Sequence, residues 1–163
     1  VFNTIYELWP GATESIAPGA FDESVSDDVR ALYNHNTDLV LGRTAAGTME
    51  IKQDSHGLWG RVKINREDTD AMNAYARIRR GDITGCSFGF DIAAQETDYR
   101  EDGTVHWTLT QISPLYEISP CTFPAYQETV VSARKRDWED IRKKRSEMWK
   151  YQTREKLKNI VSR

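Results

Sequence analysis

Apolar and polar residues alternate with a period of two over much of the first 133 residues, a pattern typical of β-strands that bury one face. The clearest case is a pair of runs, 48–52 and 58–64, separated by the turn residues Asp54-Ser55-His56-Gly57. This arrangement predicts a β-hairpin. Dense or alternating apolar residues predict further strands at 29–35, 83–92, 105–109 and 115–119.

One segment follows a helical period instead. Apolar residues recur at every third position within 70–80, and Gly81 follows at the place where helices commonly end. Thr69 or Asp70 is the predicted N-cap. With strands on both sides of this helix, the pattern predicts a mainly β chain with a few helices (α+β), built on a mixed or antiparallel sheet that could close into a barrel.

Charge divides the chain into two parts. The whole sequence has 22 Lys+Arg and 25 Asp+Glu, a net charge of −3, but residues 1–133 hold 10 basic and 20 acidic residues, a balance of −10. Residues 134–163 hold 12 basic and 5 acidic residues, a balance of +7, and no Gly or Pro. We therefore predict a domain at 1–133 and a basic helical tail at 134–163, whose apolar residues need a partner for part of their burial.

Composition excludes several classes of protein. A hydrophobic fraction of 39% is enough for a packed core, and no apolar run reaches the roughly 18–20 residues of a membrane helix. The two cysteines, Cys86 and Cys121, form neither a zinc ligand set nor a disulfide framework. No phosphate loop or dinucleotide fingerprint is present, so we expect no cofactor, no metal and no membrane partner. The initial Val1 suggests a processed or trimmed chain.

Gly85-Cys86-Ser87-Phe88-Gly89 fits the G-x-S-x-G pattern of a serine nucleophile. In α/β-hydrolases a strand precedes this serine and a helix follows it, whereas here the predicted helix comes first. We therefore exclude that fold and keep Ser87 as a candidate, because small glycines on both sides leave room for a substrate carbonyl. The alternative is that Ser87 is a structural serine between turn glycines. The neighbouring Cys86 is a rival nucleophile, although a cysteine in this position can also be interpreted as a small core residue.

A serine nucleophile needs a base, and His35 is the best of three histidines. His35 ends a predicted apolar strand before the predicted turn 36–38, so its ring can be held rigidly. His56 lies in a polar turn, and His106 lies on the polar face of its strand. A structural histidine at the end of the strand is the alternative interpretation of His35.

A third group must orient the imidazole ring, and Glu117 is the candidate. It interrupts the apolar strand Leu115-Tyr116-Glu117-Ile118-Ser119, where a carboxylate is costly to bury without a partner. That partner is His35 if the residues form a catalytic site. It is an arginine, such as Arg43 or Arg61, if the pairing is only structural.

With these residues in view, the chain resembles the prohead (capsid maturation) protease family of tailed bacteriophages. The resemblance covers about residues 17–132, and five segments in the same order carry it: 16–22, 29–36, 40–44, 78–90 and 115–126. His35 stands in the Asn-His element and Ser87 in the Ser-Phe-Gly-Phe element. Many family members have His-Asp where this chain has His35-Asn36.

The resemblance implies a serine endopeptidase with His35 and Ser87 as catalytic residues, and it places Glu117 at the third position. The family is similar in fold to the herpesvirus assemblins, which are β-barrel serine proteases, so the resemblance implies an assemblin-like β-barrel with flanking helices. The expected substrates are the major capsid protein and scaffold segments, with cleavage of its own chain, inside the immature virion assembled in the host cytoplasm. A homodimer is expected because assemblins act as dimers. Backbone N–H groups at 121–123 are the expected oxyanion donors.

A rival function of another class is a non-catalytic interaction protein, in which a protease-like domain carries a basic tail that binds the shell or nucleic acid. A charge of +7 over 30 residues permits contacts with phosphates, and Trp138, Trp149 and Tyr151 could stack on bases. Nucleic acid is therefore expected as a partner only through the tail.

Overall fold

The computed structural model describes residues 1–124 and residue 143. Within residues 1–124 the chain is mainly β, with one α-helix and one short 3-10 helix. The helix α1 spans Thr69–Arg80, and the 3-10 helix η1 spans Ser24–Ser26. The strands are β1 (Tyr6–Trp9), β2 (Ala12–Ile16), β3 (Arg30–Tyr33), β4 (Asn36–Arg43), β5 (Met49–Gln53), β6 (Leu58–Val62), β7 (Gly85–Tyr99) and β8 (Val105–Cys121).

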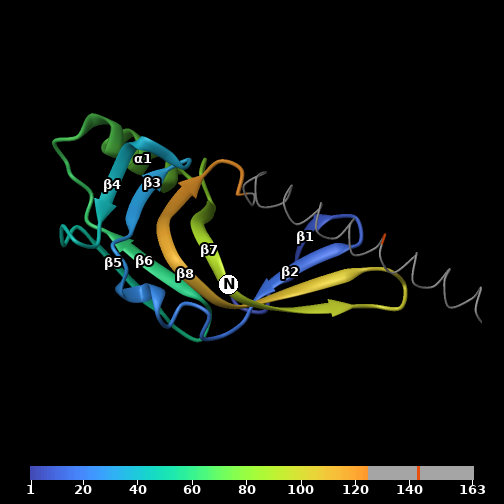
Figure 1. Ribbon diagram of the computed structural model, residues 1–163. Coiled ribbons are helices and arrows are strands. Elements are labelled where there is room, and N and C mark those ends of the chain that lie inside the picture. The colour runs from blue at the N-terminus through green and yellow to red at the C-terminus, as the bar shows by residue number, and fades with distance from the viewer. Residues whose placement is uncertain (125–142, 144–163) are drawn as a thin grey trace, which may run out of the picture. The chain divides into compact units, whose positions relative to one another are not determined.

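The 17-residue strand β8 organises the main sheet. It pairs antiparallel with β7 from Val105 to Cys121, so the two strands form one long, bent hairpin (Figure 1). It also pairs in parallel with two other strands, with β2 at residues 105–109 and with β3 at residues 117–118. The sheet order is β1-β2-β8-β3-β4 with β7 added at β8, and β5 and β6 form a separate two-stranded sheet.

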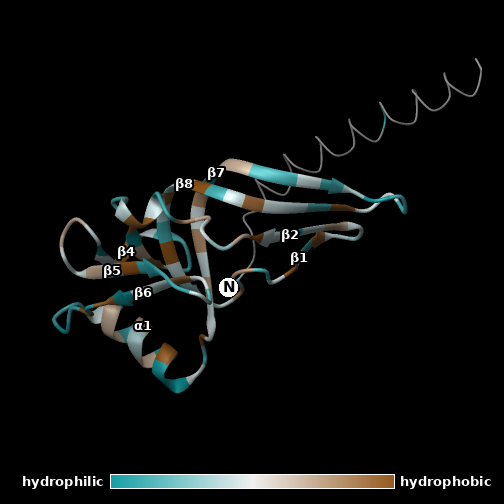
Figure 2. Ribbon diagram, turned by 90° about the horizontal axis from the view of Figure 1, so that it is seen from below, coloured by the Kyte–Doolittle hydropathy of each residue, from teal (hydrophilic) through white to brown (hydrophobic). Residues whose placement is uncertain are grey.

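The core lies along the middle of this sheet. Figure 2 shows apolar and polar segments alternating along β7 and β8, as expected for strands with one buried face. The largest buried apolar side chains come from β2, β8 and the segment after β2, and each contributes about 1.5–3 kcal/mol of hydrophobic stabilisation. They are Ile16, Phe21, Val29, Leu109, Ile112 and Leu115.

The predicted helix and hairpin are confirmed. The helix α1 matches the predicted segment 70–80 with one added residue, and Gly81 ends it with φ +88°, a left-handed conformation that glycine adopts without strain. The N-cap is Asp68, whose carboxylate accepts hydrogen bonds from Asp70 and Ala71, so the prediction of Thr69 or Asp70 as the cap was wrong by one or two residues. Strands β5 and β6 form the predicted antiparallel pair.

Several strands differ from the prediction, and β7 runs to Tyr99 where the predicted strand ends at residue 92. The turn after β3 consists of residues 34 and 35, because Tyr33 pairs with Asn36 and β4 already begins there. Strand β8 runs unbroken through the predicted gap at 110–114, because β7 pairs with it on both sides of that gap. The hairpin β1–β2 was not predicted, although Trp9-Pro10-Gly11 is a turn signal.

The predicted assemblin-like barrel is not found among residues 1–124. The path of the main sheet starts at β1 and ends at β4, and these two strands do not pair with each other. The reason is that β2 and β3 share one edge of β8, each along a different stretch, instead of following one another around a cylinder. The result is a bent, open sheet.

Two predictions fall outside the described residues. The predicted domain boundary after residue 133 lies there, and so does the predicted helical tail at 134–163 apart from Lys143, which is exposed and helical. Among the described residues, no helix has the length and apolarity required to span a membrane.

Candidate active site

His35 lies in a two-residue turn that is fastened to β8. The turn joins β3 to β4, and both of its residues have positive φ, +53° at Asn34 and +58° at His35, the conformation that tight hairpins require. The Asn34 N–H donates to the Pro120 carbonyl at 3.1 Å. The Asn34 side-chain oxygen accepts a hydrogen bond from the Thr122 N–H at 2.9 Å. These two bonds fix the turn, and therefore the His35 ring, against the end of β8.

The structure brings His35 and Glu117 together. The His35 Nδ1 lies 2.7 Å from the Glu117 Oε1, and the Glu117 side chain is only 10% exposed. The partner of this buried carboxylate is thus the histidine. Arg43, the arginine considered above, binds Asp28 instead, and Arg61 binds Glu50. The other ring nitrogen, His35 Nε2, is buried and has no hydrogen-bond partner among the described residues, so it is available as a base.

Ser119 binds both members of this pair. Its hydroxyl donates to the Glu117 Oε2 and accepts a hydrogen bond from the His35 backbone N–H at 3.2 Å. Because the carboxylate has a separate donor for each oxygen, its plane is fixed relative to the imidazole ring.

Ser87 lies on the neighbouring strand, directly opposite Ser119. The register of β7 and β8 pairs Ser87 with Ser119 and Gly89 with Glu117. Residues paired in this way point to the same face of an antiparallel sheet, with Cα atoms about 4.5–5.5 Å apart. The half-buried Ser87 side chain therefore lies on the face that carries Glu117 and Ser119. Its hydroxyl makes no hydrogen bond to His35 Nε2, and the bond between a nucleophile and its base often tightens only when substrate is bound.

Neither cysteine has the properties of a nucleophile. Neighbouring protein atoms partly shield the sulfur from water, and this desolvation raises the pKa of the Cys86 thiol above its usual value. Nearby Cys121 and Glu117 add to the shift. A raised pKa keeps the thiol protonated, while the reactive form is the thiolate. The interpretation of Cys86 as a core residue was wrong, because the residue is exposed at its strand end. Cys121 is buried.

The other histidines lie away from this site. The His56 side chain is 90% exposed in its turn, as predicted. His106 is half-buried. Its Nδ1 lies 2.8 Å from the Thr13 hydroxyl, and its Nε2 lies 2.9 Å from the Ser15 hydroxyl. Burial lowers the pKa of His106. Both of its ring nitrogens are engaged, so it has none free to serve as a base.

One of the backbone N–H groups expected as oxyanion donors at 121–123 already has another hydrogen-bond acceptor. The Thr122 N–H is committed to the Asn34 side chain, so it cannot also donate to a substrate oxygen without releasing the turn.

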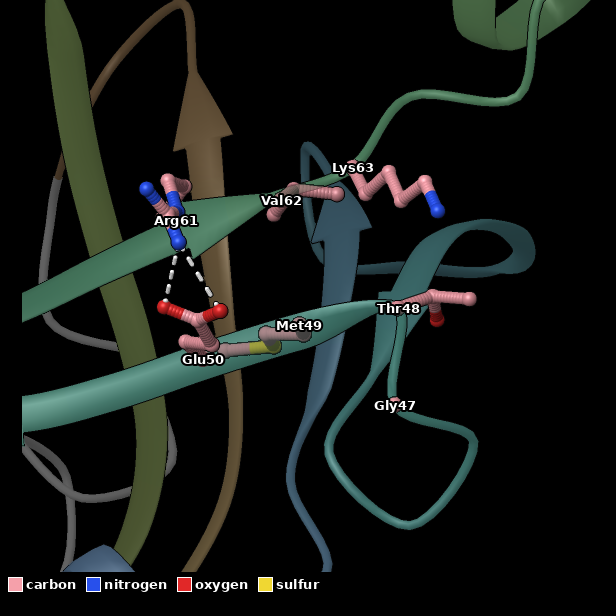
Figure 3. Close-up of a pocket in the computed structure, with 7 residues that line it drawn as sticks. All are labelled: Gly47, Thr48, Met49, Glu50, Arg61, Val62 and Lys63. Atoms are coloured by element: carbon pink, nitrogen blue, oxygen red, sulfur yellow. Dashed lines mark hydrogen bonds and ion pairs between the residues drawn. The ribbon is translucent and has the colours of Figure 1, made fainter.

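A cavity elsewhere on the surface does not supply a second candidate site. It is lined by residues of β5, β6 and their flanks, where Arg61 and Glu50 satisfy one another (Figure 3). The described residues contain no group of three or more His, Cys, Asp or Glu able to hold a metal ion.

A family of known proteins, described as caudovirus prohead serine protease, matches residues 1–144 of the chain. The chain belongs to this family. Within the prohead proteases, that of Enterobacteria phage HK97 is 29% identical over 124 residues, which cover 74% of this chain and 52% of that protein. The chain thus spans about half the length of this relative. No solved structure matches the chain significantly.

Sequence reasoning missed two residues of this candidate site. Asn34 and Ser119 hold the candidate residues in place through side-chain hydrogen bonds. A signal for Ser119 was present, because a polar residue two positions after Glu117 in an apolar strand must lie on the same face. Asn34 carried a weaker signal, since asparagine is common in turns that require positive φ.

Gly89 leaves the space that the Glu117 carboxylate occupies. A Cβ atom at residue 89 would lie 2.7 Å from the Glu117 Oε1, the oxygen that contacts His35. We expect Gly89→Ala to displace this oxygen and to slow peptide-bond cleavage about 100-fold, the usual effect of a displacement of roughly 1 Å at a reacting group. Cleavage rates of purified variants measure this.

The matched control for that substitution is Gly42→Ala. Gly42 is also a strand glycine without room for a side chain, since its Cβ would meet the Val62 Cγ1 at 2.8 Å, but it lies on β4 and neither residue belongs to the site. Equal losses of activity in the two variants would show that crowding of a strand, and not displacement of Glu117, is responsible.

Proposed function

We propose that this chain is the serine endopeptidase part of a prohead protease, with Ser87 as nucleophile, His35 as general base and Glu117 as the group that orients His35. The observation that carries the proposal is the arrangement of His35, which binds a buried carboxylate through Nδ1 and has no hydrogen-bond partner at Nε2 among the described residues. The strand that carries this carboxylate pairs with the strand of Ser87. Membership of the prohead serine protease family supports the same conclusion.

In the proposed mechanism, the Ser87 Oγ attacks the scissile carbonyl carbon while His35 Nε2 accepts the hydroxyl proton. Glu117 stabilises the imidazolium through its bond to Nδ1–H. Collapse of the tetrahedral intermediate breaks the C–N bond, and His35 gives its proton to the departing amine. Water then attacks the acyl-enzyme with His35 again as base, which releases the carboxylate product and restores the Ser87 hydroxyl.

The proposed substrates are the capsid protein and scaffold segments of an immature phage head, and the chain's own sequence is a further substrate. The proposal rests on the family description and on the relative named prohead protease. Action inside the immature virion, assembly in the host cytoplasm and a homodimeric state belong to the same proposal. In the rival proposal, a non-catalytic interaction protein, Ser87 has no enhanced reactivity.

Covalent labelling tests the proposal without a known substrate. A fluorophosphonate probe loses fluoride when an activated serine oxygen attacks its phosphorus, so we expect one label per folded chain, mapped to Ser87 by mass spectrometry of peptides. Unfolded protein should remain unlabelled, because activation requires His35 beside Ser87. Absence of labelling in the folded protein, or labelling at another residue, would reject Ser87 as the nucleophile and favour the interaction protein.

A further inference from the structure

Ser119 occupies an unusual place in the site. It is 0% exposed, it lies on β8 two residues after Glu117, and the register places it opposite Ser87. A buried hydroxyl needs hydrogen-bond partners to offset the loss of contact with water. Its two partners are the two candidate residues that must cooperate in proton transfer, His35 and Glu117.

The direction of each bond follows from the chemistry of the groups. A backbone N–H can only donate, so the His35 N–H gives its hydrogen to a lone pair of the Ser119 oxygen. The single hydroxyl hydrogen of Ser119 is then directed at the Glu117 Oε2. The carboxylate thus accepts one bond from Ser119 and one from His35 Nδ1, each at a different oxygen. Rotation of the carboxylate would break both bonds at once.

We propose that Ser119 is a positioning residue of the protease, which aligns the Glu117 carboxylate with the His35 ring and fixes the turn that carries His35. This inference rests on the proposed function. Ser119 is not a second nucleophile, because its oxygen is buried and its hydrogen is engaged by Glu117. Its effect on catalysis passes through His35, so it should change how fast Ser87 reacts and leave the binding of small probes unchanged.

Ser24 provides a matched control. It is also a serine that is 0% exposed, and its hydroxyl also donates a hydrogen bond to a buried acceptor, the carbonyl of Ile112. Ser24 lies in η1, and its hydroxyl binds the Ile112 carbonyl and none of the candidate residues. Replacing either serine with alanine removes one buried hydroxyl, which makes two hydrogen bonds at Ser119 and one at Ser24, so the Ser24 variant shows what the loss of a buried serine hydroxyl does outside the site.

The experiment compares Ser119→Ala with Ser24→Ala in the rate at which a fluorophosphonate probe labels Ser87, normalised to the folded fraction. We expect the maximal labelling rate of Ser119→Ala to fall about 10- to 100-fold, as for other losses of a hydrogen bond to a charged group, with half-saturation at the same probe concentration. Ser24→Ala should label at the wild-type rate. The low-field proton resonance of the His35 Nδ1–H should shift only in Ser119→Ala.

Equal labelling rates for the two alanine variants, with wild type labelled at Ser87, would overturn the role of Ser119 and leave the proposed function intact. No labelling of wild type would instead reject the proposed function. If Ser119→Ala does not fold, Ser119→Thr carries the test, because it keeps the hydroxyl and adds a methyl group. We then expect a labelling rate within about threefold of wild type, and a tenfold loss in folded Ser119→Thr would overturn the inference.

Discussion

Ser87→Ala is expected to lower the rate of peptide-bond cleavage by about 10⁴-fold or more, because the variant lacks the oxygen that forms the acyl-enzyme in the proposed mechanism. The fold should be unaffected. Ser87 is half-buried, and no hydrogen bond of its hydroxyl holds the described part of the chain together, so the free energy of unfolding should change by no more than about 0.5 kcal/mol. Cleavage of capsid protein by purified variants measures the rate, and thermal unfolding measures the stability.

Cys86→Ala is the control for Ser87→Ala. Cys86 is the adjacent residue of the same strand and the only other nucleophilic side chain within one residue of Ser87. Its raised pKa keeps the thiol protonated, so its loss should leave cleavage unchanged. Continued cleavage by Ser87→Ala combined with an inactive Cys86→Ala would assign the reaction to the thiol. Mass spectrometry of the same samples would show whether shortening of the chain itself also depends on Ser87.

Glu117→Gln is expected to lower kcat by about 10³- to 10⁴-fold with little change in KM, because in the proposed mechanism the charge of Glu117 stabilises the imidazolium only while a proton is in transit. The carboxylate has two donors to satisfy, the His35 ring and the Ser119 hydroxyl. Glutamine has a single side-chain oxygen, so one of these donors must face its amide hydrogens. Steady-state kinetics on a peptide containing a mapped cleavage site separates kcat from KM.

Glu14→Gln is the control for this substitution. Glu14 is 1% exposed and lies on β2, which pairs with the opposite end of β8 from Glu117. Both substitutions place a neutral amide where the protein buries a carboxylate, but only one alters His35. Near wild-type kcat in Glu117→Gln would reduce the site to a Ser87–His35 pair and leave Glu117 a purely structural role.

Local signals in the sequence were sufficient for the elements that depend on neighbouring residues. The hairpin β5–β6 and the helix α1 follow from turn residues, periodicity and a terminal glycine, all within about a dozen positions. The candidates His35, Ser87 and Glu117 came from residue type, local pattern and family resemblance. The structure adds that the side chains of His35 and Glu117 are joined by a hydrogen bond. This contact links residues that are 82 positions apart in the sequence.

The predictions that failed depended on pairing between distant strands. Whether β2 and β3 follow one another around a barrel or share one edge of β8 is decided by packing across the sheet, which leaves no mark in a short window. The same holds for the turn at residues 34 and 35. Asparagine is common in turns, but Asn36 belongs to β4 because it pairs with Tyr33. Ser119 was overlooked since its importance lies in its two partners.

The pairing of β3 and β7 with the last few residues of β8 has a consequence for the timing of activity. His35, Ser87 and Glu117 come from three separate stretches of chain. Glu117 lies on β8 itself, and His35 and Ser87 reach it only when β3 and β7 have joined β8. Such long-range pairing forms late, because the entropy of closing large loops must be overcome first. We therefore expect a nascent chain to lack the candidate site until β8 has been made, and the proposed proteolysis to begin only after β3 and β7 have joined β8.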